Sequence, residues 1–171
     1  MRRLFLLALA LATASLAIAA PSLAAKRHEI PPELQVPQAP VPHRLVLSAL
    51  GKGVQIYDCV NNVWTFREPA AAILRGKHTV ALHYAGPTWQ SVKDGSKVVG
   101  TVVARVDAKH PERDIPLLLL SARSTGPGLF AGVDFIQRLE TKGGVAPTGA
   151  CQPGASIAVP YTATYNFWAP A

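Results

Sequence analysis

Proline and glycine interrupt this chain so often that long helices are not expected in its body. The 171 residues include 15 prolines and 13 glycines, and only 16% of them are charged. Between these interruptions, short runs of β-branched and aromatic residues alternate with polar positions, a pattern typical of strands. Coiled coils and helical repeats are therefore excluded, and a hydrophobic content of 49% excludes a chain that is disordered throughout.

About nine short strands at regular spacing are expected, which favours an antiparallel β-sandwich or a small β-barrel. The expected strands cover residues 45–50, 53–58, 63–66, 79–84, 88–92, 97–106, 115–122, 130–141 and 159–168. We expect Gly51-Lys52-Gly53 to form the turn between the first two strands, and residues 70–74 to form one helical turn. The sequence therefore predicts an all-β fold with at most one short helix.

The period of two residues along a strand assigns side chains to its two faces. In the last expected strand, the core face carries Tyr161, Ala163, Tyr165 and Phe167. Residues 115–122 form a continuous apolar run, which predicts a strand buried on both faces. Asp134 and Arg138 share one face of a strand, and we expect them to form an ion pair.

The first 25 residues have the features of a secretory signal peptide. Arg2 and Arg3 precede an apolar stretch at residues 4–20, and Ser22-Leu23-Ala24 offers small residues before a cut. Cleavage between Ala20 and Lys26 is expected, which predicts a secreted or periplasmic protein without stable insertion in the membrane. An uncleaved anchor is the alternative, but the apolar stretch reaches only about 25 Å as a helix, against about 30 Å of hydrocarbon. The arginine pair also resembles a twin-arginine signal, although unfolded export is favoured.

Residues 26–43 are expected to form a proline-rich arm, and residues 44–171 a single β domain. The arm contains five prolines, which favour extended polyproline II and exclude a helix; they are Pro31, Pro32, Pro37, Pro40 and Pro42. Packing along the flank of the domain is preferred over a role as a docking peptide.

Cys59 and Cys151 are the two cysteines of the chain. Outside the cytoplasm an even pair indicates a disulfide. The alternative is a pair of soft-metal ligands, but such sites usually need three or four protein ligands, and the sequence contains no Cys-x-x-Cys or His-x-His motif. We therefore expect a disulfide and no metal.

The net charge of +7 does not point to nucleic acid. The basic residues are scattered along the chain, with no run that follows a phosphate backbone. A solvated surface with weak affinity for anionic glycans or lipids is the simpler interpretation. The oligomeric state is left open.

One tight turn gathers side chains that suit ligand binding. His83, Tyr84 and Trp89 surround Gly86-Pro87, which places an imidazole, a phenol and an indole close together. Asp94, Arg138 and Thr141 are added as tentative ligand-binding residues. The simpler alternatives are a hydrogen-bonded core histidine beside a buried tryptophan, and for Asp94 a turn residue before Gly95.

No catalytic motif accompanies these residues. The sequence has no Gly-x-Ser-x-Gly elbow, no phosphate-binding loop, no Gly-x-Gly-x-x-Gly fingerprint and no His-Glu-x-x-His helix. We therefore expect no catalytic residue, no metal and no cofactor, and the sequence favours a protein that is not an enzyme.

Several segments, in order along the chain, resemble the domain-of-unknown-function 3455 family of secreted bacterial and fungal proteins. They are GVQIYDC at 53–59, HYAGPTW at 83–89, DGSKV at 94–98, IPLLL at 115–119, IQRLETKGGVAP at 136–147, Cys151, and VPYTATY at 159–165. The resemblance covers residues 45–168 and implies an exported, mainly β domain. It implies no established activity and no catalytic residue.

The leading hypothesis is a non-enzymatic β domain that binds a small molecule or glycan through His83, Trp89 and residues 141–147. One alternative is a hydrolase or lyase outside the cytoplasm that uses His83 with Asp94 or Arg138. Another is a structural or interaction module of the cell envelope, which would expose a large apolar patch or an unpaired strand edge.

Overall fold

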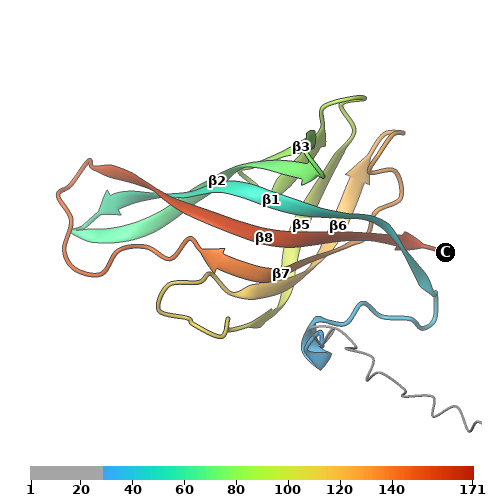
Figure 1. Cartoon of the computed structure of the whole chain (residues 1–171), viewed down its shortest axis with the longest axis horizontal. Coiled ribbons are helices and arrows are strands. Elements are labelled where there is room, and N and C mark those ends of the chain that lie inside the picture. Colours follow the sequence, from blue (N-terminus) through green and yellow to red (C-terminus); the bar gives the residue numbers. More distant parts are fainter. Residues whose placement is uncertain (1–28) are drawn as a thin grey trace, which may run out of the picture.

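The computed structural model describes residues 29–171, so the expected signal peptide lies outside the described residues. One 3-10 turn and eight strands make up the fold (Figure 1). They are η1 (Pro32–Leu34), β1 (His43–Val60), β2 (Val63–Arg75), β3 (His78–Tyr84), β4 (Thr88–Ser91), β5 (Lys97–Val106), β6 (Leu117–Thr125), β7 (Phe135–Gly143) and β8 (Ser156–Pro170). The predicted all-β fold is confirmed.

The eight strands form a closed antiparallel barrel in which each strand pairs with the next and β8 pairs with β1. The choice left open between sandwich and barrel is thus decided for the barrel. Because successive strands are antiparallel, the β1–β2, β3–β4, β5–β6 and β7–β8 connections lie at one end of the barrel. The β2–β3, β4–β5 and β6–β7 connections lie at the other.

The expected turn at Gly51 and the expected helical turn at residues 70–74 are both wrong. Gly51 lies inside β1, where a Cβ atom would come within 2.7 Å of Tyr165 Cδ2, so this glycine allows close packing and does not turn the chain. Residues 70–74 lie inside β2, with Ala71 and Ile73 buried in the core at a strand's period of two. The two expected strands 45–50 and 53–58 are therefore one strand of 18 residues.

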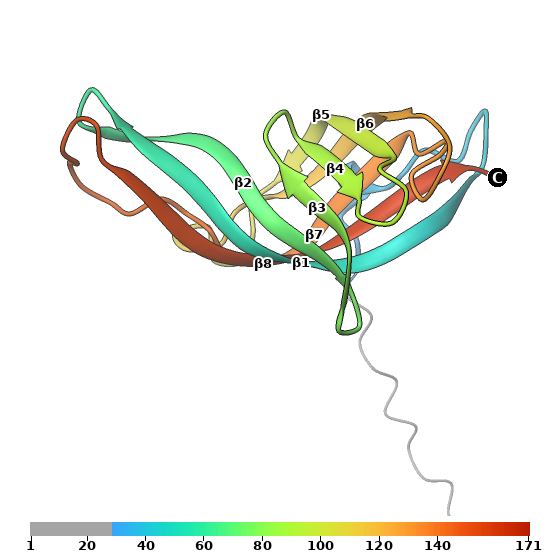
Figure 2. The ribbon, with the colours of Figure 1, turned by 90° about the horizontal axis from the view of Figure 1, so that it is seen from above.

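The long strands β1, β2 and β8 continue beyond the barrel as a three-stranded extension (Figure 2). β3 pairs with β2 only from Ala71 onward, and β7 pairs with β8 only from Tyr161 onward. Pro69 and Pro160 stand at these two points, in register with β1. Since proline has no N–H to offer a neighbouring strand, it suits the place where a strand becomes an edge.

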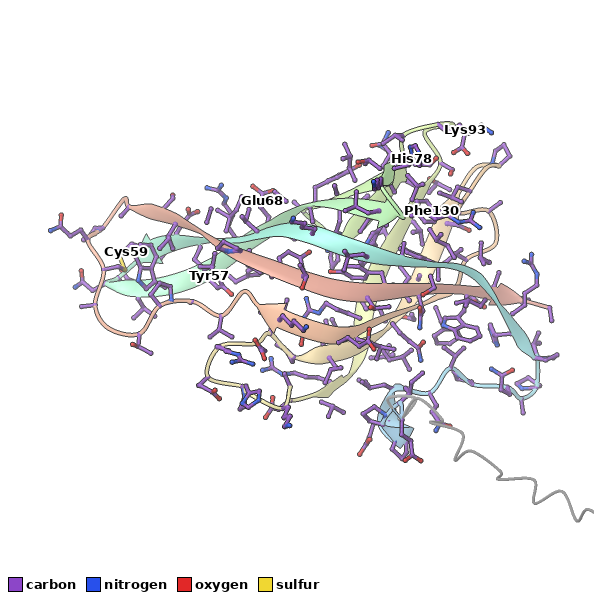
Figure 3. The ribbon with its side chains drawn as sticks, in the orientation of Figure 1. Tyr57, Cys59, Glu68, His78, Lys93 and Phe130 are labelled. Atoms are coloured by element: carbon purple, nitrogen blue, oxygen red, sulfur yellow. A yellow bond between two sulfur atoms is a disulfide. The ribbon has the colours of Figure 1, made fainter. Side chains whose placement is uncertain are left out.

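The predicted disulfide is confirmed and closes the tip of this extension (Figure 3). It joins Cys59, near the end of β1, to Cys151 in the β7–β8 loop, with Cα atoms 5.8 Å apart. Cys59 N also donates to Ala155 O at 2.8 Å. The disulfide therefore holds the β7–β8 loop against β1 at a place where the barrel wall supports neither of them.

The main hydrophobic core lies inside the barrel, and a second core lies outside its β6–β7 wall. The core face predicted for the last strand is confirmed, since Tyr161, Ala163, Tyr165 and Phe167 are all buried. Leu118 and Leu120 of β6 point into the barrel core, while Leu119 belongs to the outer core. The run at residues 115–122 is thus buried on both faces, as predicted.

The proline-rich arm covers that outer core. Leu34 is fully buried and packs with Leu119 and Leu139, and Gln137 Nε2 donates to Leu34 O at 2.7 Å. The expected packing along the flank is confirmed over the described part of the arm. The expectation that the arm holds no helix is wrong in one detail, because η1 forms a single 3-10 turn that inserts Leu34.

The expected ion pair between Asp134 and Arg138 is absent from residues 29–171. Asp134 instead accepts from His43 Nε2 at 3.0 Å, and His43 Nδ1 lies 2.7 Å from Pro37 O. This contact ties the end of the arm to the barrel. The Arg138 side chain instead lies at the barrel end that carries the β5–β6 and β7–β8 loops.

Candidate functional site

A cavity of about 630 Å³ opens at the barrel end from which the extension projects. All eight strands line it, with Arg138 as the contribution of β7, together with the β3–β4, β5–β6 and β7–β8 loops.

The opposite end is closed by the β6–β7 loop, whose Phe130 is fully buried and packs on Phe167 with ring centroids 4.9 Å apart. Packed core side chains therefore fill this end of the barrel.

An aromatic stack forms one wall of this cavity. The His83 and Trp89 rings lie parallel, with centroids 4.1 Å apart and an interplanar angle of 4°. The Tyr165 ring meets both edge-on, at 5.4 Å from each. β3 and β4 pair His83 directly with Trp89, and this register explains the stack.

His83 is a neutral imidazole held in one orientation. Its Nδ1 lies 2.9 Å from Thr88 O, which can only accept, so Nδ1 carries the proton and Nε2 keeps its lone pair. Burial lowers the pKa of His83 to about 4, the bond to Thr88 raises it in part, and the charge of Arg138 lowers it further. His83 therefore offers a hydrogen-bond acceptor at neutral pH.

Arg138 brings a positive charge to the same cavity. Its Nε and Nη2 both donate to Pro116 O, at 3.1 and 2.9 Å, which fixes the guanidinium against the β5–β6 loop. The charge lowers the pKa of His83 and opposes the effect of burial on the neighbouring tyrosines. Among residues 29–171, Arg138 has no carboxylate within salt-bridge distance.

Two donors in the cavity lining have no partner within the described chain. Trp89 Nε1 and Gln55 Nε2 are both buried, in side chains that are 1% and 3% exposed, and neither makes a hydrogen bond there. Gln55 lies close enough to the Tyr161 hydroxyl to lower its pKa, but outside hydrogen-bond geometry. A buried donor without a partner costs about 1–3 kcal/mol.

The phenols of Tyr57 and Tyr165, which line the cavity, and that of the neighbouring Tyr161 stay protonated. Burial raises the pKa of Tyr57, Tyr161 and Tyr165 above the ordinary value. Tyr57 donates to Gly144 O at 2.6 Å, and the Tyr161 and Tyr165 hydroxyls lie 3.1 Å apart. These groups therefore act as hydrogen-bonding and packing groups and do not contribute negative charge.

The β5–β6 loop and Asp114 form part of the rim. Burial raises the pKa of Asp114, but the bonds from Gly143 N at 2.7 Å and Arg113 Nε at 3.1 Å outweigh it, so the pKa lies below its ordinary value. This carboxylate is charged and already occupied. It holds the loop to the start of the β7–β8 connection.

The structure brings together some of the residues selected from sequence and separates others. His83, Trp89 and Arg138 line the one cavity, as do Val145 and Ala146 of the loop at residues 141–147. Tyr84 does not line it, because Tyr84 follows His83 directly and so faces the other side of β3, where its hydroxyl donates to Gln90 Oε1. Tyr165 supplies the phenol beside the imidazole in its place.

Asp94 lies at the closed end of the barrel, away from the cavity lining. Its carboxylate accepts from Ser96 Oγ at 2.6 Å, Ser96 N at 3.0 Å and Leu129 N at 3.0 Å. These bonds, led by that from the Ser96 hydroxyl, lower the pKa of Asp94 to about 2. Asp94 therefore fastens the β6–β7 loop over the closed end.

Thr141 lines a second cavity of about 520 Å³, under the arm and separate from the aromatic stack. It stands at an irregularity between Leu139 and Lys142 where β7 shifts register against β8. Glu140, next to it, has a φ of 49°. Thr141 lies two residues after Leu139, which lines the same cavity, so the period of two already places both side chains on the face of β7 opposite Arg138.

Sequence reasoning missed Gln55 and Tyr57 as cavity residues. Both lie on β1, in a stretch read as an ordinary alternating strand. Gln55 is a buried amide on the inward face of β1, and a polar amide at an inward position of the alternating pattern was the available signal.

Residues 29–171 contain no group of three or more His, Cys, Asp or Glu side chains placed to hold a metal ion. In the same part of the chain, no helix has the length and hydropathy of a membrane span.

No curated protein and no solved structure matches this chain. A family model described as "Protein of unknown function (DUF3455)" matches residues 40–169, which include the barrel and its extension except for Pro170, the last residue of β8. The chain therefore belongs to the DUF3455 family.

Proposed function

We propose that this protein works outside the cytoplasm as a binding module for a small molecule or glycan, which it holds in the barrel cavity without transforming it. The observation that carries the proposal is the cavity of about 630 Å³ with its stack of His83, Trp89 and Tyr165. Ligand sites are typically concave and mostly apolar, with a few placed polar groups and volumes of about 300–1,000 Å³. This cavity has those properties.

The disulfide supports a place outside the cytoplasm. The Cys59–Cys151 bond is typical of proteins in oxidising compartments. The signal-like features of residues 1–25 agree with this placement.

A hydrolase or lyase remains the competing hypothesis for the same cavity. Asp94 lines the closed end instead, so this hypothesis would use His83 with Arg138. A histidine with a pKa of about 4 is a weak base at neutral pH, which makes it a poor proton acceptor in catalysis. Its fixed orientation and neutral form suit a hydrogen bond to a bound ligand better.

The third hypothesis, an interaction module, finds support in the extension. Within the described chain, β2 from 63 to 70 and β8 from 156 to 160 each have one unpaired edge. The prolines at positions 69 and 160 lie on these edges and oppose strand addition there. The cavity is therefore the stronger candidate.

The test is a thermal-shift screen of the purified protein against cell-wall glycans and small metabolites. A ligand at about 100 times its Kd stabilises the folded state by about 2.7 kcal/mol, which should raise the Tm by several degrees. Absence of any stabilising ligand would contradict the proposal. Turnover of a bound ligand would favour the hydrolase or lyase hypothesis.

A matched pair of variants on β5 tests whether the ligand binds in the cavity. Val102 lines the cavity and is 48% exposed, so Val102→Phe should narrow the mouth without disturbing the core. Val99, 40% exposed on the same strand, does not line the cavity and supplies the control Val99→Phe. We expect the Tm shift to fall in the first variant and to persist in the second.

A further inference from the structure

We propose that the ligand of this cavity is a small organic carboxylate with a flat apolar body, bound with its carboxylate against Arg138. This inference rests on the binding function proposed above and narrows it to one chemical class. Two features of the cavity carry it: an arginine without a carboxylate partner and an apolar aromatic wall.

Arg138 differs from the other arginines of the cavity lining. Arg67 pairs with Asp58 and Glu68 at 3.0 and 3.1 Å, and Arg105 lies 3.7 Å from Asp107. Arg138, the third, is half-buried and has no carboxylate partner within residues 29–171. A half-buried guanidinium without a counter-ion is costly, and a carboxylate matches its fork geometry.

The cavity offers Arg138 no counter-ion of its own. The carboxylate of Asp114, which also lines the cavity, is already bound by Gly143 N and Arg113 Nε. A ligand that complements Arg138 therefore brings oxygen acceptors and negative charge. A neutral sugar brings as many donors as acceptors and leaves Arg138 without its counter-ion.

The apolar lining of the cavity indicates the shape and polarity of the rest of the ligand. Trp89 and Tyr165 form a wall with Leu118 and Leu120, and Phe66 lies near the mouth. Offset or edge-on contacts with aromatic rings favour a planar partner. The cavity volume of about 630 Å³ accommodates a body of one or two rings, whereas acetate would leave most of this wall uncovered.

The experiment compares 2-naphthoate with 2-naphthamide, two probes of nearly equal shape of which only the first is charged. Binding is measured by isothermal titration calorimetry on the purified protein at pH 7.5. We expect 2-naphthoate to bind at least tenfold more tightly than 2-naphthamide. Equal affinities would overturn the carboxylate assignment while leaving the binding function intact.

Substitution of Arg138 tests the contact itself. Arg138→Gln should weaken 2-naphthoate binding at least tenfold and leave the affinity for 2-naphthamide within about twofold, since only the charged probe uses the guanidinium. Arg123→Gln removes the same charge from an exposed position of β6 outside the cavity and should change neither affinity. An equal loss in both variants would assign the effect to net charge and overturn the proposal.

The comparison of the two probes on the unchanged protein decides the matter even if Arg138→Gln fails to fold without its bonds to Pro116 O. If uncharged compounds from the thermal-shift screen bind and 2-naphthoate does not, the carboxylate assignment fails alone. If no compound in either experiment binds, the proposed function fails with it.

Discussion

Mild acid should destabilise this protein through His83. The imidazole is 4% exposed, stacks on Trp89 and donates from Nδ1 to Thr88 O. Burial holds its pKa at about 4, against 6.5 for the free side chain. Below pH 6.5 the unfolded chain therefore takes up a proton that the folded protein refuses until about pH 4, so folding stability falls as pH falls through this window.

The size of the effect follows from the difference between the two pKa values. At about 1.4 kcal/mol per pKa unit, the depression to about 4 corresponds to a full loss of about 3 kcal/mol. Between pH 7.5 and 5.0 the expected loss in the free energy of unfolding is about 2 kcal/mol. That is a large share of the net stability of a small domain.

Urea unfolding, followed by tryptophan fluorescence at pH 7.5 and 5.0, measures this loss. His83→Gln removes the imidazole. When the pH is lowered from 7.5 to 5.0, the free energy of unfolding of this variant should therefore fall less than that of the parent, by a difference of about 2 kcal/mol. His78→Gln, at an exposed histidine of the same strand, should behave as the parent does. Asp94, with a pKa of about 2, titrates below this window in the folded protein.

Two results would refute the reasoning. One is the same loss of stability in the parent and in His83→Gln. The other is a pKa for His83 near 6.5 in an NMR titration of the folded protein, a measurement that also serves if His83→Gln does not fold. Either result would mean that the folded protein accepts the proton on a buried ring without a penalty.

Three further substitutions test the fold. Replacing Cys59 and Cys151 by serine opens a loop of 92 residues and should lower the free energy of unfolding by about 4–5 kcal/mol, measured by urea unfolding against the oxidised parent; an unchanged midpoint would contradict the role of the bond. Gly100→Ala places a Cβ 2.8 Å from a Leu120 methyl and 3.3 Å from the indole behind it, and should cost about 1–3 kcal/mol; a Tm equal to that of the parent would show that the wall yields. Leu34→Ala should cost about 2–5 kcal/mol if the arm is part of the folded unit, whereas Gln35→Ala, exposed beside it, should cost little; equal, small losses would mean that the arm is only loosely attached.

Local pattern was sufficient for the class of the fold and for the faces of individual strands. The alternation of Tyr161, Ala163, Tyr165 and Phe167 predicts a buried face because side chains on a strand repeat every two residues. The apolar run at 115–122 predicts burial on both sides, and the arm supplies the second cover. The pairing of the two cysteines followed from their number and the expected compartment.

Local sequence pattern was not sufficient to place one glycine and one pair of charged residues. Gly51 has the composition of a turn, yet it lies inside a long strand because a ring from the neighbouring strand needs the space. Asp134 lies just before β7 and pairs with His43, whereas Arg138 lines the cavity and donates to Pro116 O. Neither partner can be identified from spacing within one strand.

Sequence alone determined that this chain is an all-β protein with one disulfide, and it marked His83, Trp89 and Arg138 as residues of interest. Only the tertiary structure decided that the sheet closes and that these three side chains meet Gln55 and Tyr165 around one cavity. The physical reason is that a period of two residues reports on which side of its own strand a residue lies. Which residues face it across the barrel depends on closure and on the register of strands far apart in the chain.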